Sequence, residues 1–177
     1  MRRRRLQLAA VVAVLGLLGV VAAAVAGGGN RDVREHLTGY EETPMTLSTD
    51  GWGDFKARVR EDKIDYKLTY EQLEGDATQA HIHLGREATT GGISAYLCFT
   101  TQTNAPAGTP TCPADGGTVR GTIERTDVIG PAPQGIAALE FEELLRAIRA
   151  GATYANVHST KYPTGEIRAQ LERGHDD

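Results

Sequence analysis

The stretch FKARVREDKIDYKLTY, residues 55–70, decides the fold class of this chain. Apolar residues alternate with polar ones on both sides of a charged turn at residues 61–63. The apolar positions are Phe55, Ala57, Val59, Ile64, Tyr66, Leu68 and Tyr70. Successive side chains of a strand point to opposite faces, so this alternation predicts two strands that each bury one face. The short turn between them predicts an antiparallel hairpin.

Further strand patterns extend over the rest of the chain. They are expected at residues 80–84, 94–100, 118–125, 153–158 and 166–172, with turn-like segments between them. One short helix is expected near residues 138–150. Its apolar residues Phe141, Leu144, Leu145 and Ile148 follow helical spacing, and Gly151 stands at the position of a C-terminal cap. This pattern predicts an all-β fold, an antiparallel two-sheet sandwich or barrel of the Greek-key, immunoglobulin-like or superoxide-dismutase-like kind.

The N-terminus has the composition of an export segment. Arg2–Arg5 form a positive block, and residues 6–26 follow without a single charge and end in small residues. Such a segment is either a signal peptide that is cleaved near Ala26 or an N-terminal membrane anchor that spans the bilayer through residues 6–26. In both cases the arginines stay in the cytoplasm and the remainder of the chain lies outside it, secreted or tethered.

Length and charge define the exported part. A chain of 177 residues predicts one domain with appendages: segment 1–26, a linker at 27–33, a domain at 34–173 and a tail at 174–177. Residues 1–26 hold four arginines and no acid, so the remainder has 15 basic and 23 acidic residues and a net charge of −8. This acidity argues against nucleic acid as a partner and leaves an extracytoplasmic ligand or protein.

The only two cysteines, Cys98 and Cys112, flank a loop of Thr, Asn, Gly and Pro. In an oxidising compartment such a lone pair predicts a disulfide bond. Their spacing is not that of a Cys-x-x-Cys metal site.

Three expected strands share one arrangement, with apolar residues on one face and long polar residues on the other. The polar residues are His81 and His83 on the first, Asn156 and His158 on the second, and Glu166, Arg168 and Gln170 on the third. If these strands are neighbours, their polar side chains converge on one surface that faces outward from the sheet.

Three chemical interpretations fit this polar surface. His81, His83 and His158 could bind Cu or Zn, with Glu166 as a fourth ligand or as an acceptor for an imidazole N–H. The same residues could instead form a polar network that joins strands or faces a ligand. A metal-free acid–base site, with His as the base and Arg168 as an anion clamp, is the third. No nucleophile elbow, phosphate loop or dinucleotide fingerprint is present in the sequence.

Several motifs in order resemble those of the CHRD domain, the module repeated in chordin and found singly in microbial exported proteins. The motifs are LTGYEETP at 37–44, Gly51-x-Gly53, AHIH at 80–83, GTI at 121–123, YANVHS at 154–159 and GEIRAQL at 165–171. The resemblance covers about residues 34–173. Ala155, Ser159 and Ala169 depart from the usual residues, and none of these changes removes a polar member of the strands.

The resemblance implies an extracellular β-sandwich-like module and no particular activity. Chordin binds secreted growth factors, and that role does not transfer to a lone microbial copy. The expected function is therefore a non-enzymatic, extracytoplasmic binding or envelope-structural module. The alternative is a Cu- or Zn-binding protein or a metal-dependent extracytoplasmic enzyme that uses His81, His83 and His158.

Overall fold

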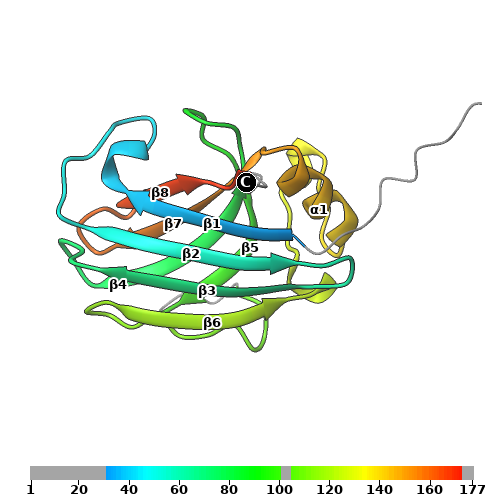
Figure 1. Ribbon diagram of the computed structural model, residues 1–177, viewed down its shortest axis with the longest axis horizontal. Helices are drawn as coiled ribbons and strands as arrows, with labels where there is room; N and C mark the ends of the chain where they lie inside the picture. The colour runs from blue at the N-terminus through cyan, green and yellow to red at the C-terminus, as the bar shows by residue number, and fades with distance from the viewer. Residues whose placement is uncertain (1–30, 101–104, 173–177) are drawn as a thin grey trace, which may run out of the picture.

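The computed structural model describes residues 31–100 and 105–172, which form one curled sheet of eight strands (Figure 1). The strands are β1 (Arg31–Thr38), β2 (Trp52–Val59), β3 (Ile64–Glu71), β4 (Ala77–Leu84), β5 (Ile93–Phe99), β6 (Gly117–Ile123), β7 (Thr153–Ser159) and β8 (Ile167–Gln170). They lie in the order β5-β4-β7-β8-β1-β2-β3-β6, and every neighbouring pair is antiparallel. The prediction of an all-β antiparallel sandwich or barrel with one short helix is confirmed.

The hairpin expected from residues 55–70 is the pair β2 and β3, in which Val59 lies opposite Ile64 across the turn. The alternating apolar residues of both strands point into the curled sheet and are buried there. Their charged neighbours point to the outside, as the period-two pattern requires. The same alternation places Ala80, Ile82, Val157 and Ile167 of the other half of the sheet in the same core.

Two contacts between strands of the curled sheet are held by few bonds, and each is called a joint here. The first joins β8 to β1, and the second joins the edge strands β5 and β6. β8 and β1 are paired only through Thr38 and Arg168, and beyond this pair the backbone N–H groups of Gln170 and Glu172 donate to the carboxylates of Glu41 and Glu35. These bonds join the half-sheet β5-β4-β7-β8 to the half-sheet β1-β2-β3-β6. Carboxylates thus take the place of part of a backbone ladder at this joint.

The second joint lies between the edge strands β5 and β6. The Tyr66 side chain on β3 passes over Gly121 of β6, and its hydroxyl donates to the Leu97 carbonyl of β5 at 2.6 Å. A Cβ atom at position 121 would lie 2.3 Å from that hydroxyl, so only glycine leaves room for the ring. The predicted disulfide between Cys98 and Cys112 is present at the same joint and has a Cα–Cα distance of 5.0 Å.

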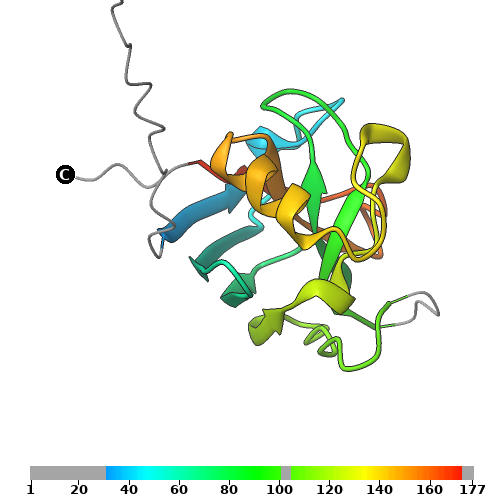
Figure 2. The same ribbon diagram turned by 90° about the vertical axis from the view of Figure 1, so that its right-hand side faces the viewer.

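The helix α1 (Phe141–Arg149) lies across one end of the curled sheet (Figures 1 and 2). Its four predicted apolar residues are all buried against the core. The left-handed backbone of Gly151, at φ +62°, ends the helical segment as the sequence predicts. Three short 3₁₀ helices complete the structure: η1 (Gly39–Glu41), η2 (Arg125–Asp127) and η3 (Ala132–Gln134).

The strand β1 begins at Arg31, so residues 31–33 of the expected linker belong to the sheet. The sequence pattern did not predict this strand because Glu35 interrupts the apolar series of Val33 and Leu37. Segment 1–26, the rest of the linker and the tail at 174–177 lie outside the described residues. Within residues 31–100 and 105–172, no helix is long and apolar enough to cross a membrane.

Candidate functional site

Neighbouring strands bring most of the predicted polar residues together on the outer face of one half-sheet. The antiparallel register places His81 of β4 opposite Asn156 of β7, which lies opposite Arg168 of β8. The next row on this face holds His83, Tyr154 and Gln170. The single row between them, Ile82, Ala155 and Ala169, is apolar and points into the core. The three strands are therefore neighbours in the sheet, which the sequence alone could not establish.

The polar residues lie on the outer face of the half-sheet, but they are not exposed to solvent. They point away from the core, but loops cover them, and none is more than 8% exposed. Arg168 donates to the carbonyls of Thr89 and Arg86 at 2.9 and 3.0 Å, and Gln170 donates to the Gly85 carbonyl at 3.0 Å. These bonds hold the 85–92 loop over the outer face. Alternation predicts the side of a strand on which a residue lies, but it does not predict which loop covers it.

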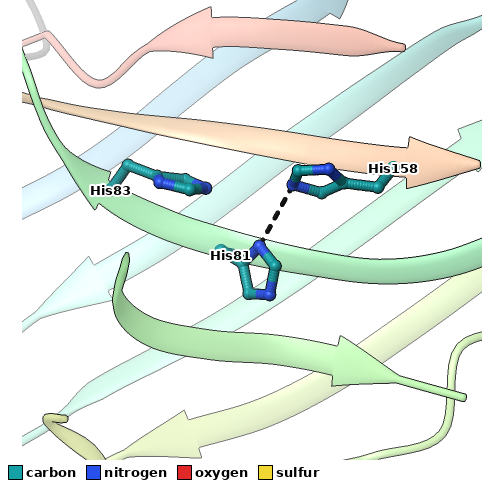
Figure 3. A group of neighbouring side chains, drawn as sticks. All are labelled: His81, His83 and His158. Carbon is teal, nitrogen blue, oxygen red and sulfur yellow. Dashed lines mark hydrogen bonds between the residues drawn. The ribbon is translucent and has the colours of Figure 1, made fainter. Parts of the chain in front are cut away.

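Three imidazoles form a compact group beneath these loops, here called the three-His group: His81, His83 and His158. Figure 3 shows the rings gathered on the same side of β4 and β7. One nitrogen from each ring lies within 4.8 Å of the others. The closest pair is Nδ1 of His81 and Nε2 of His158, at 3.1 Å.

Hydrogen bonds to the backbone set the protonation of two of these rings. Nδ1 of His83 lies 3.0 Å from the Gly91 carbonyl, and Nδ1 of His158 lies 3.0 Å from the Pro163 carbonyl. A carbonyl oxygen can only accept, so both Nδ1 atoms carry the proton and both Nε2 atoms carry a lone pair. His81 must then donate from Nδ1 to Nε2 of His158. The remaining ring atoms, Nε2 of His81 and Nε2 of His83, are buried without a partner.

Burial keeps all three rings neutral. Burial, together with smaller effects of the neighbouring His158 and His83, lowers the pKa of His81 to about 2. It also lowers the pKa of His83 and of His158 to about 4, although their hydrogen bonds to Gly91 and Pro163 act in the opposite direction. The neutral imidazole is the form that binds Cu and Zn.

Glu166 does not join the three-His group. Its Oε1 accepts a hydrogen bond of 2.7 Å from the backbone N–H of Glu74, and its Oε2 is buried without a partner. The acceptors for the N–H groups of His83 and His158 are backbone carbonyls, which a side-chain pattern cannot reveal. Among the described residues, the only group of three or more His, Cys, Asp or Glu side chains close enough to share an ion is the three-His group.

Two aromatic residues that the sequence reasoning missed enclose the site. The ring of Tyr154 stacks on His83 with centroids 4.7 Å apart and planes inclined by 2°, and the ring of Tyr96 meets His81 edge-on at 4.5 Å. Tyr154 shares its strand face with Asn156 and His158, so the alternation that identified those residues could have found it.

A buried carboxylate, that of Glu42, was also missed. Asn156 donates its side-chain N–H to Oε1 of Glu42. Burial raises the pKa of Glu42 to about 7, while a backbone hydrogen bond from Thr43, the charge of Arg168 and the Asn156 hydrogen bond lower it. Glu42 belongs to the segment LTGYEETP, so its hydrogen bond with Asn156 brings that segment to the site.

The fold and this site define a small all-β antiparallel domain with a buried group of three neutral imidazoles. The CHRD domain family model matches residues 33–171, and the chain belongs to the CHRD family. No curated protein and no solved structure matches the chain. Family membership supports a binding or structural module without enzymatic activity, and both the CHRD domain and the disulfide are compatible with an extracellular protein.

Proposed function

We propose that this chain is an exported CHRD module that binds one Cu or Zn ion through His81, His83 and His158, and that it acts by binding rather than by catalysis. The observation that carries the proposal is the fixed protonation of His83 and His158. Each is held by a backbone carbonyl at Nδ1, and each presents the lone pair of Nε2. Metal-binding histidines characteristically use one nitrogen for the ion and donate from the other to such an acceptor.

The unpartnered Nε2 of His83 favours a metal over a purely structural network. A buried polar atom without a hydrogen bond costs about 1–3 kcal/mol, and an ion bound there would remove that cost. His81 would bind through Nδ1, which lies next to Nε2 of His158. Without an ion, only one imidazole lone pair of the group, that of His158, accepts a hydrogen bond. Two nitrogens bound to tetrahedral zinc lie about 3.3 Å apart, as follows from a Zn–N distance of about 2.0–2.1 Å. The 3.1 Å between His81 and His158 is close to that separation.

Burial supports a binding role for the site. A catalytic zinc site keeps one coordination position open for water or substrate. Here the 85–92 loop and Tyr154 lie over the group, and His81 is 0% exposed. An ion held in this way would join β4, β7 and the loops above them, so it would stabilise the domain on binding.

The proposal is tested by elemental analysis of the full chain prepared without a histidine tag. About one Cu or Zn per chain is expected, and His83→Gln and His158→Gln should each lose most of it. The matched control is His36→Gln, which removes an exposed imidazole of β1 that bonds to Asp54 of β2. A wild-type protein that stays metal-free after incubation with Cu and Zn, or a loss of metal equal in the control, would refute the proposal.

Export is the second part of the proposal and has its own test. It is supported by the arginine block and the apolar run of residues 6–26, together with the disulfide. Mass spectrometry of the native N-terminus distinguishes a chain cleaved near Ala26 from one that keeps its anchor. Recovery of the intact chain from the cytoplasmic fraction would contradict export.

A further inference from the structure

Four cations form a single row across the outer face of the half-sheet that does not carry the three-His group. Arg34 of β1 lies opposite Lys56 of β2, Lys56 opposite Lys67 of β3, and Lys67 opposite Arg120 of β6. This set of four residues is called the basic row. Neighbouring strands are about 4.8 Å apart, so the row is about 14 Å long.

The rows on either side of the basic row contain acidic side chains that contact their neighbours. On one side Arg58 pairs with Asp32 at 3.4 Å, and Thr122 donates to Asp65 at 2.9 Å. On the other side His36 bonds to Asp54 at 3.2 Å. Each of these flanking rows therefore carries acidic side chains.

The basic row itself lacks such compensation. Arg34 has only a loose contact of 3.9 Å with Asp32. In the part of the chain that the structure describes, no carboxylate lies within ion-pair distance of Lys56, Lys67 or Arg120. Like charges placed directly opposite each other destabilise a sheet. The positive charges of the basic row are not neutralised by neighbouring carboxylates of the described residues, although the net charge of the domain is negative. This arrangement indicates a surface that binds an anionic partner.

We propose that the basic row binds a linear acidic polysaccharide, one that carries sulfate, phosphate or carboxylate groups along its length. A shallow groove offers the place for such a chain, and all four cations line it, together with Arg58, Arg60, Asp32 and Asp65 at its side. The row is one charge wide, which matches a linear polyanion lying across the strands. Anionic groups of the polymer would alternate with the cations and relieve their mutual repulsion.

The surroundings of the row argue against two other polyanions. A flat anionic membrane would also meet Asp32 and Asp65 on one side and Asp54 on the other, which would repel it. Single-stranded nucleic acid is usually held by aromatic rings that stack on its bases, and the only aromatic residue lining this groove, Tyr66, is buried with its hydroxyl bonded to Leu97.

The test measures binding of the full chain to fluorescently labelled dextran sulfate by anisotropy. Wild type should bind dextran sulfate and not neutral dextran, with an affinity that falls as salt is raised. Lys56→Gln combined with Lys67→Gln should weaken binding by about tenfold or more. The double variant should also unfold at or above the wild-type temperature, because it removes like-charge repulsion and leaves the core intact.

The matched control is Arg146→Gln combined with Lys161→Gln. It changes the net charge by the same amount but removes exposed cations of α1 and of the turn after β7, which pair with Glu143 and Glu74. Equal loss of binding in the control would overturn the proposal, since net charge alone would then explain it. So would absence of dextran sulfate binding, or tighter binding of wild type to single-stranded DNA or to phosphatidylglycerol vesicles. None of these outcomes depends on the metal content of the three-His group.

Discussion

The guanidinium carbon of Arg168 lies 3.6 Å from the centre of the Tyr154 ring. The same ring stacks on His83, and the Tyr154 hydroxyl accepts a hydrogen bond from the backbone N–H of Gly91. Gly91 in turn accepts the Nδ1 proton of His83. A continuous set of contacts thus runs from a buried cation on β8 to the nitrogen that fixes the protonation of His83.

This relationship predicts that Arg168→Gln weakens Cu or Zn binding although Arg168 is not a ligand. The variant loses the hydrogen bonds that hold the 85–92 loop, so Gly91 no longer orients His83. We expect an affinity loss of about tenfold, measured by competition with a chelator of known affinity. Arg86→Gln is the control, because only the backbone carbonyl of Arg86 contacts Arg168. Equal metal affinity in wild type and Arg168→Gln would refute this role.

The lowered pKa values of the three imidazoles predict acid sensitivity of the metal-free protein. In the folded state His83 and His158 take up protons only near pH 4, whereas in the unfolded chain they do so near pH 6.5. The unfolded state therefore binds more protons between these values, and stability falls as pH drops below about 6.5. Each such imidazole should contribute a loss of about 2 kcal/mol at pH 5 relative to pH 8.

Urea unfolding of chelator-treated protein at several pH values measures this loss. His83→Gln should be less stable than wild type at pH 8, and the difference should shrink toward pH 5, because one imidazole no longer takes up a proton on unfolding. A difference that is constant over this range would show that His83 is not held neutral by burial.

Glu42 should have the opposite pH dependence. Its pKa is raised to about 7 in the folded protein, so the folded state binds more protons than the unfolded state above about pH 4.5. The stability that this carboxyl contributes is present below pH 4.5 and is lost as pH rises toward 7. Glu42→Gln keeps an acceptor for Asn156 and removes the buried charge.

We expect Glu42→Gln to raise the free energy of unfolding by up to about 3 kcal/mol at pH 8 and by less than about 1 kcal/mol at pH 5. Glu61→Gln, in the exposed turn between β2 and β3, serves as the control. The same gain at both pH values would contradict a titrating Glu42.

The joint between β5 and β6 predicts a sharp penalty for Gly121→Ala. The new Cβ atom would stand 2.3 Å from the Tyr66 hydroxyl, so the ring must move and its hydrogen bond to Leu97 must break. Overpacking of this kind costs about 1–3 kcal/mol, and the lost hydrogen bond adds about 1 kcal/mol. Tyr66→Phe removes the hydrogen bond alone and should cost less. Thermal unfolding that ranks the two variants in the reverse order would contradict this account of the joint.

Removal of the disulfide should destabilise the same joint. Cys98 and Cys112 are both buried and close a loop with a sequence separation of 14. Replacing both with alanine should lower the free energy of unfolding by about 3 kcal/mol, chiefly because the unfolded chain gains freedom. Denaturant unfolding measures the loss, and an unchanged midpoint would show that the loop is held by other contacts.

The sequence alone predicted those parts of the fold in which apolar and polar residues alternate without interruption, such as the hairpin of β2 and β3. It did not predict β1, where Glu35 accepts a hydrogen bond from the backbone N–H of Glu172, just after β8, and so breaks the pattern. Periodicity also placed His81 and His83 on one face. It could not predict that loops bury them or that Glu166 bonds to Glu74, because these contacts join segments far apart in the chain.

The joint between β8 and β1 also has a mechanical consequence. The described residues begin at Arg31 on β1 and end at Glu172 just after β8, so the segments that flank the domain attach to the two strands that meet there. Because these strands are antiparallel, tension between the flanking segments would separate them one contact after another. The pair of Thr38 and Arg168, together with the carboxylates of this joint, would then set the tensile strength of the domain, and the long ladders on either side would carry little of the load.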